Sequence, residues 1–326
     1  MAEGVTLTFS NPDGYAAAFS GARVNLTITG AGDFAARLTR INLQHLEVYR
    51  CHESLPRIAY ISLPADRIIL SVPAGSLSCI FGGFALRNGN ILFHSRGERL
   101  HQCSNGAFDW GLISLSAEQL AYCSKALIGR RITSPHVSRV LCPARPAALQ
   151  LQRLFRQICH LAETREELIG RPEVARALEQ EMLHAIVHCV ADNHEAHATG
   201  TARHHHAAVM VRFEEALTKH IDQKLDMPTL CAEIGVPERT LRMCCAEFLG
   251  VSPKRYLLLQ RLNRARAALS RADPSTASVA EIARKNHFLE FGRFAVTYRT
   301  VFGESPSVTL QREAPRDGEL ERLHRR

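Results

Sequence analysis

The stretch LCAEIGV at residues 230–236 indicates how the C-terminal part of this chain folds. Cys231 and Gly235 are four residues apart, and Pro237 begins another helical segment. A helix-turn-helix needs a small residue at the first of these positions, because the second helix crosses closely over the first. The turn itself favours glycine, which accepts positive φ. The stretch therefore predicts a helix-turn-helix unit.

The same arrangement occurs a second time further along the chain. IARKNHF at 282–288 repeats the first stretch at an offset of 52, and GESP at 303–306 repeats GVSP at 250–253 at an offset of 53. A helical pattern from about 253 to 270 joins the two copies. Because the repeated features keep their order and spacing, we predict two helix-turn-helix units held apart by one long helix.

These motifs resemble those of the AraC/XylS type of transcriptional regulator. The resemblance is carried by SPKRYL at 252–257, RLNRAR at 261–266, SVAEIA at 278–283 and FGESP at 302–306. It covers residues 207–312, about a third of the chain. It implies an all-α domain that inserts the second helix of each unit into successive major-groove segments of double-stranded DNA. It also implies RNA polymerase as a partner.

The DNA contacts are expected on the second helices, at about 237–248 and 290–302, and on the joining helix. Arginine chelates guanine, glutamate accepts from cytosine, and basic residues of the joining helix neutralise phosphates. The candidates are Glu238, Arg239, Thr240, Arg242, Lys254, Arg264, Glu290, Arg293, Thr297 and Arg299. We rank Arg239, Arg242 and Arg293 first. For each polar candidate, simple exposure to solvent is the alternative interpretation.

The sequence also predicts which side of the last long helix is buried. It departs from the family pattern at two places. Spacing of i, i+4, i+7 and i+8 places Phe294, Tyr298, Val301 and Phe302 in the core. His287 stands at the second turn, where the family usually has glycine, so a strained turn is expected. MCC at 243–245 replaces a stretch that the family usually makes basic and aromatic.

Charge is distributed unevenly over the chain. The net charge is +8, but residues 1–200 carry 19 Lys+Arg against 17 Asp+Glu, whereas residues 201–326 carry 21 against 15. The stretch 248–272 holds six basic residues and no acidic one. A nearly neutral N-terminal part and a basic C-terminal part agree with DNA as the partner of the latter.

Residues 1–115 predict a β-rich region. Strand-like segments occupy 24–29, 41–49, 57–63, 67–72 and 77–86, and Asn88-Gly89-Asn90 before 91–93 predicts a hairpin. The fold class expected is α+β: an N-terminal cupin- or jelly-roll-like domain with appended helices, followed by the all-α domain of two helix-turn-helix units.

The segment after Ser116 predicts helices. A capping box at Ser116 opens a helix to about 127, and apolar stripes follow at 151–161 and 178–189. The stripes pack on the sheet or against a second copy of the chain. We place a regulatory and dimerisation domain at 1–192, a polar linker at 193–206, the DNA-binding domain at 207–312 and a polar tail at 313–326. Histidines at 194, 197 and 204–206 fit a polar linker better than a metal site.

A small-molecule effector is expected in the apolar interior of the β-rich domain, as an inference from family architecture. The speculative wall residues are Tyr49, Tyr60, Phe84 and Trp110, with Phe81 and Phe93 as further aromatics. Such aromatics are more often core than ligand contacts. No cofactor and no catalytic residue is nominated.

Two alternatives from other classes stay open. Adjacent Cys244 and Cys245 suggest a thiol- or metal-responsive regulator, although side chains 100° apart on a helix oppose joint capture of a metal. His94, Glu98 and His101 suggest a cupin-type metalloenzyme, although the His-x-His element of that class is absent. Ten scattered cysteines without an export signal, and no apolar run of about 20 residues, predict a cytoplasmic protein that does not enter a membrane.

Overall fold

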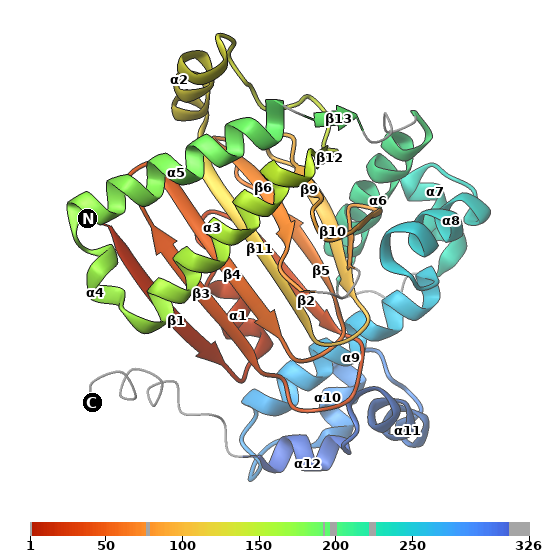
Figure 1. The fold of residues 1–326 in the computed structure, drawn as a ribbon. Helices are drawn as coiled ribbons and strands as arrows, with labels where there is room; N and C mark the ends of the chain where they lie inside the picture. Colours follow the sequence, from red (N-terminus) through yellow and green to blue (C-terminus); the bar gives the residue numbers. More distant parts are fainter. Residues whose placement is uncertain (1, 76–78, 192, 196–200, 222–225, 313–326) are drawn as a thin grey trace.

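The computed structural model describes residues 2–75, 79–191, 193–195, 201–221 and 226–312 (Figure 1). Its N-terminal part is a β-sandwich, and its C-terminal part is helical. The strands are β1 (Glu3–Phe9), β2 (Arg23–Ile28), β3 (Ala36–Asn42), β4 (Leu46–Glu53), β5 (Arg57–Ser62), β6 (Arg67–Pro73), β7 (Cys79–Phe81), β8 (Phe84–Leu86), β9 (Ile91–Phe93), β10 (Arg99–Ser104), β11 (Phe108–Ser116), β12 (Arg139–Pro143) and β13 (Asn193–Glu195). The fold class predicted from sequence is therefore confirmed.

The strands form two antiparallel sheets. The larger sheet has the order β1-β3-β4-β11-β6-β9-β12-β13, and the smaller has the order β2-β5-β10-β7-β8. Alternate residues of the larger sheet face different layers: Phe108 and Trp110 of β11 point between the sheets, whereas Ile113 and Leu115 point toward helices. Burial on both faces explains why β6, inside this sheet, is buried at every residue except Arg67.

The helices of the N-terminal part are α1 (Pro12–Ala17), α2 (Ala117–Ile128), α3 (Arg145–Thr164), α4 (Glu166–Ile169) and α5 (Pro172–Ala191). The serine half of the predicted capping box is confirmed: the Ser116 hydroxyl oxygen accepts a hydrogen bond from Gln119 N–H at 3.0 Å and so caps the start of α2. Helices α3 and α5 lie across the larger sheet (Figure 1). Gly111 allows this approach, because a Cβ there would lie 2.3 Å from the Phe155 ring. Of the two alternatives for the apolar stripes, packing on the sheet is the one observed.

Two predicted strands and one predicted hairpin need correction. The segment 41–49 is two strands joined by a turn in which Leu43 N–H donates to Leu46 O, and both leucines are buried, so the apolar pattern runs through the turn. The segment 77–86 is divided by Gly82 and Gly83, which have φ of 54° and 79°. The predicted hairpin around Gly89 is wrong, because β8 belongs to the smaller sheet and β9 to the larger one.

A buried ion pair lies between the two sheets. Arg57 Nε donates to Glu53 Oε2 at 2.5 Å, and both side chains are about 1% exposed. Tyr15 OH and Trp110 Nε1 each donate to Glu53 Oε1 at 2.9 Å, and Arg57 Nη1 donates to Gln102 O at 2.8 Å. These hydrogen bonds compensate the cost of removing two charges from water.

The C-terminal helices are α6 (Thr201–Lys219), α7 (Met227–Ile234), α8 (Glu238–Leu249), α9 (Pro253–Arg271), α10 (Val279–Lys285), α11 (Phe291–Phe302) and α12 (Pro306–Gln311). Part of the stretch predicted as linker is regular: 193–195 pair with β12, and 201–206 belong to α6. His197 and the tail 313–326 lie outside the described residues. No helix in the described ranges is long and apolar enough to cross a membrane.

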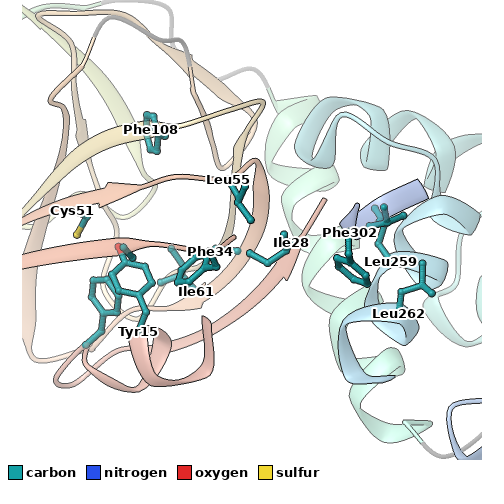
Figure 2. Close-up of a cluster of buried hydrophobic side chains, with 14 of the residues drawn as sticks. Tyr15, Ile28, Phe34, Cys51, Leu55, Ile61, Phe108, Leu259, Leu262 and Phe302 are labelled. Carbon is teal, nitrogen blue, oxygen red and sulfur yellow. The ribbon is translucent and has the colours of Figure 1, made fainter. Parts of the chain in front are cut away.

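The helical part packs on the smaller sheet. Helices α6 and α8 contact β10, and α9 contacts β2. Figure 2 shows Ile28, at the end of β2, between Leu55 on the sandwich side and Leu259 and Phe302 on the helical side. One apolar cluster therefore continues from the interior of the sandwich into the second helix-turn-helix unit.

Candidate nucleic-acid interface

The first helix-turn-helix consists of α7 and α8. Asp226 caps α7 by accepting from Thr229 N–H at 2.8 Å, and Gly235 ends it with φ of 74°. Val236 N–H donates to Cys231 O at 3.1 Å, which closes the turn. The small residue and the glycine thus hold the positions that the sequence indicated.

The outer face of α8 is charged. Arg239 and Arg242 are exposed, and Glu238 and Thr240 are half-buried. Glu238 Oε1 accepts from Arg242 Nε at 3.1 Å and from Nη2 at 2.6 Å. This exposed pair adds little stability, but it restricts the orientation of the Arg242 guanidinium. Four of the predicted DNA-binding residues therefore share the first turn and a half of α8.

The second helix-turn-helix consists of α10 and α11. The predicted core residues Phe294, Tyr298, Val301 and Phe302 are all buried, which confirms that prediction. On the opposite side, Glu290, Arg293 and Arg299 are exposed and Thr297 is half-buried. The second unit therefore also presents a helix whose far side is open to a partner.

The joining helix α9 is less open than the sequence suggested. Lys254, in its first turn, is exposed. Arg264 is half-buried, and its Nη1 donates to Ile221 O at 2.7 Å, so a phosphate contact would compete with that bond. The guanidinium groups of Arg261 and Arg266 lie over the Phe288 and Phe302 rings at 5.4 and 4.6 Å. Much of the basic cluster therefore also holds α9 against its neighbours.

Asn263 of α9 joins the two parts of the chain. Its Oδ1 accepts from Ile28 N–H at 2.9 Å, and its Nδ2 donates to Ile28 O at 2.9 Å. The side chain thus pairs with the end of β2 as a neighbouring strand would. In the sequence, Asn263 stands out only as part of RLNRAR, because no local pattern shows that a strand 235 residues away needs a partner.

The four speculative effector residues each make contacts of their own. Trp110 donates to Glu53, and Tyr49 OH donates to Glu47 Oε2 at 2.7 Å. Tyr60 packs on His101, and Phe84 lies under the Arg203 guanidinium. A role for these four residues in effector binding stays a prediction.

A large cavity lies between the two parts of the chain. Its volume is about 1160 Å³, and its walls come from α1 and β2 on one side and from α6 and α9 on the other. Arg261, Arg264 and Arg266 contribute to the α9 side, while Val24 and Leu26 contribute to the β2 side. Burial lowers the pKa of Arg261, whose Nε has no hydrogen-bond partner among the described atoms.

The side chains on which the two alternative functions depend are buried or lie within hydrogen-bond distance of other side chains. Cys244 and Cys245 are buried, and burial raises the pKa of the Cys244 thiol to about 11 and that of Cys245 still further. A thiolate, the reactive form, is therefore disfavoured at both. His94 Nδ1 lies 2.6 Å from Glu98, but His101 Nε2 lies 2.7 Å from Glu214 of α6. Within the described ranges, no three His, Cys, Asp or Glu side chains are grouped to hold a metal.

Several known proteins are similar to part of the chain. A family model described as a helix-turn-helix domain matches residues 230–312. The "Probable thc operon regulatory protein" of Rhodococcus erythropolis is 40% identical over 95 residues, 29% of either chain. The XylDLEGF operon transcriptional activator of Pseudomonas putida is 31% identical over 100 residues, 31% of either chain. A crystal structure of a "probable AraC family transcriptional regulator" from Rhodopseudomonas palustris shares 33% identity over 33% of this chain and 98% of its own, with a TM-score of 0.29.

The C-terminal region is an AraC/XylS-type helix-turn-helix domain. The relatives that share this domain are transcription regulators, and the AraC/XylS family is not a family of enzymes. The chain covers less than a third of the length of the two curated relatives above. In the AraC/XylS-type domain of this chain, α8 and α11 are the second helices of the two units, and α9 is the helix between the units.

Proposed function

We propose that this protein is a cytoplasmic transcription regulator that binds double-stranded DNA through α8 and α11. The observation that supports the proposal most is the duplicated unit, in which each second helix is anchored by a buried face and leaves an exposed face with arginines. Two such helices suit successive major-groove segments. Arg239, Arg242 and Arg293 would read bases, and Lys254 would contact phosphate.

The test is sequence-dependent binding. The full chain would be used to select duplexes from a random library, and its affinity for a selected duplex compared with a scrambled one at fixed salt. We expect a difference of at least 10³-fold, as for specific DNA-binding proteins. Equal affinity for both duplexes would contradict the proposal. Mapping of bound sites across the genome would then give the operators and neighbouring genes.

We further propose that an effector controls the protein, and that it binds the cavity between β2 and α9. Arginines on the α9 side and Val24 and Leu26 on the β2 side suit a small molecule with an anionic group and an apolar body. Asp13 and Asp33 also line the cavity, so we expect the anionic group beside the arginines of α9. Because the cavity walls come from both parts of the chain, a ligand there would alter how α9 sits relative to β2. RNA polymerase and a second copy of the chain are further partners suggested by the family resemblance.

The location of the effector can be tested with one probe and one variant. Trp110 is the single tryptophan of the chain and lies inside the sandwich, so its fluorescence reports on that region. A panel of alkyl carboxylates and phosphates would be screened by thermal shift. Binding that is lost in Arg261→Ala and leaves Trp110 emission unchanged supports the cavity. Binding that survives Arg261→Ala and quenches Trp110 supports the sandwich interior instead.

A further inference from the structure

The exposed side of α11 has an apolar centre between its arginines, whereas that of α8 carries an ion pair and a further arginine beside Met243. Val296 is 68% exposed, three residues after Arg293 and four before Thr300, in the middle of the face that points away from the core. Leu289, just before the helix, is 72% exposed. Helix α11 contains no acidic residue. This face needs a partner that tolerates positive charge and covers apolar groups.

The threonines of this face use their hydroxyl protons within the helix. Thr297 Oγ1 donates to Arg293 O at 2.7 Å, and Thr300 Oγ1 donates to Val296 O at 2.9 Å. A hydroxyl bonded in this way does not donate to a base or a phosphate. The groups that remain for a partner are therefore the methyl groups, the arginine side chains and hydroxyl oxygens that can only accept.

In the described part of the chain, neither a close contact nor the backbone conformation requires glycine at position 292. It is exposed, its φ is not in the left-handed region, and a Cβ built on it meets no atom within 4 Å. Glycine is nevertheless less favourable than alanine in a helix, by up to about 1 kcal/mol in the interior, and Gly292 is the second residue of α11. Since neither backbone conformation nor packing requires glycine here, the remaining physical reason is close approach of another molecule to the helix backbone.

We propose that α11 reads thymine, with Val296 and the Thr300 methyl packed against thymine C5-methyl groups and Gly292 at the point of closest approach. In the major groove, thymine is the base that presents a methyl group, so an apolar face discriminates for it. The surface is continuous with Arg293 and Arg299, whose positive charge suits a polyanion such as DNA. This inference rests on the proposed function.

Uracil substitution tests the inference directly, because uracil differs from thymine only by the methyl group. In a duplex selected with the full chain, each thymine would be replaced by uracil in turn. We expect a loss of about fourfold at one or two positions of one half-site, since a buried methyl contributes about 0.8 kcal/mol. Val296→Ala should remove this discrimination, and Val308→Ala, an exposed valine on α12, should retain it.

Gly292→Ala gives an independent measurement. We expect an unchanged or higher Tm, because a helical glycine is replaced and the new methyl meets nothing. Affinity for the selected duplex should nevertheless fall at least tenfold, because the methyl occupies the space that DNA needs. An affinity equal to that of the parent would overturn close approach at Gly292.

The outcomes separate the two proposals. If no duplex sequence is preferred, the proposed function fails. If sequence preference exists but no uracil substitution changes affinity, the function stands and thymine reading is overturned. If Val296→Ala leaves DNA binding and uracil discrimination intact but abolishes transcription in a purified system, the face binds a protein and thymine reading is likewise overturned.

Discussion

His287 and Gly235 occupy equivalent positions in the two helix-turn-helix turns and adopt the same left-handed backbone, with φ of 64° and 74°. The hydrogen bonds match as well: Phe288 N–H donates to Ala283 O at 2.9 Å, as Val236 N–H donates to Cys231 O at 3.1 Å. Among the described residues, His287 is the only non-glycine with positive φ. The second unit therefore keeps the turn geometry of the first despite an unfavourable residue.

We expect His287→Gly to raise the free energy of unfolding by about 1 kcal/mol, because the Cβ that opposes left-handed φ is removed. Urea unfolding of the full chain would measure it. Gly235→Ala is the matched control in the first turn and should lower stability by a similar amount. A less stable His287→Gly protein would show that the imidazole contributes more than its backbone strain costs.

Arg293→Ala should weaken binding to a selected duplex by about 1–3 kcal/mol if Arg293 reads a guanine. Binding to random DNA should change much less. Fluorescence anisotropy at constant salt would measure both affinities. The control is Lys285→Ala, which removes an equal charge from α10, where Lys285 pairs with Glu281 at 3.0 Å. Equal losses on both kinds of DNA would leave Arg293 with a phosphate contact only.

Lys254→Ala should weaken binding to specific and random duplexes alike. Because a phosphate contact releases counterions, the slope of log affinity against log salt should fall by about one unit. Lys125, exposed in the last turn of α2, provides a control of the same residue type in the N-terminal part. An unchanged slope for Lys254→Ala would place this lysine away from the DNA backbone.

Asn263→Ala should loosen the junction between the two parts of the chain. The backbone N–H and C=O of Ile28 would lose their partner, at a cost of about 1–3 kcal/mol. Calorimetry should show a lower Tm and a broader transition. The control is Asn286→Ala, whose side chain donates to Ile282 O within α10 and does not reach β2. Equal effects of the two substitutions would argue against a special role of Asn263 at the junction.

Glu53→Gln should reduce stability at pH 7 by about 3–5 kcal/mol, because the buried Arg57 charge loses its partner. Burial by itself raises the pKa of Glu53, but the Arg57 charge and the hydrogen bonds from Arg57, Trp110 and Tyr15 outweigh it, so the folded-state pKa is lowered. Its ionised form therefore stabilises the fold above the unfolded pKa of about 4.3.

This contribution is lost as pH falls through the lowered pKa of the folded state, so the stability gap between parent and Glu53→Gln should narrow below about pH 4. Urea unfolding across a pH series would measure the gap. Glu47→Gln is the control, since Glu47 and Arg67 form a partly exposed pair at 3.3 Å that contributes little. A gap that stays constant with pH would show that Glu53 does not act through its charge.

The helical region was largely predictable from residues close together in sequence. Positive-φ turns and the apolar spacing of α11 depend on contacts between residues about four apart, and these appear at the predicted positions. The N-terminal strands were predicted less well. The segment before Gly89 and the segment after it look like hairpin partners, yet β9 pairs with β6 and β12, which no local pattern specifies.

The residues of α9 show the same division. The sequence of α9 was enough to predict a basic helix between two repeated units. The helical spacing of its apolar residues and the Ser-Pro pair at its start are both local properties. Its contacts with Ile28, and the cavity that it forms with β2, follow from docking against a strand more than 200 residues earlier. Strand pairing and docking join residues that are distant in sequence, and their free energy depends on which faces become buried together. That information resides in the folded chain as a whole, whereas the helix-turn-helix signal is complete within each short stretch.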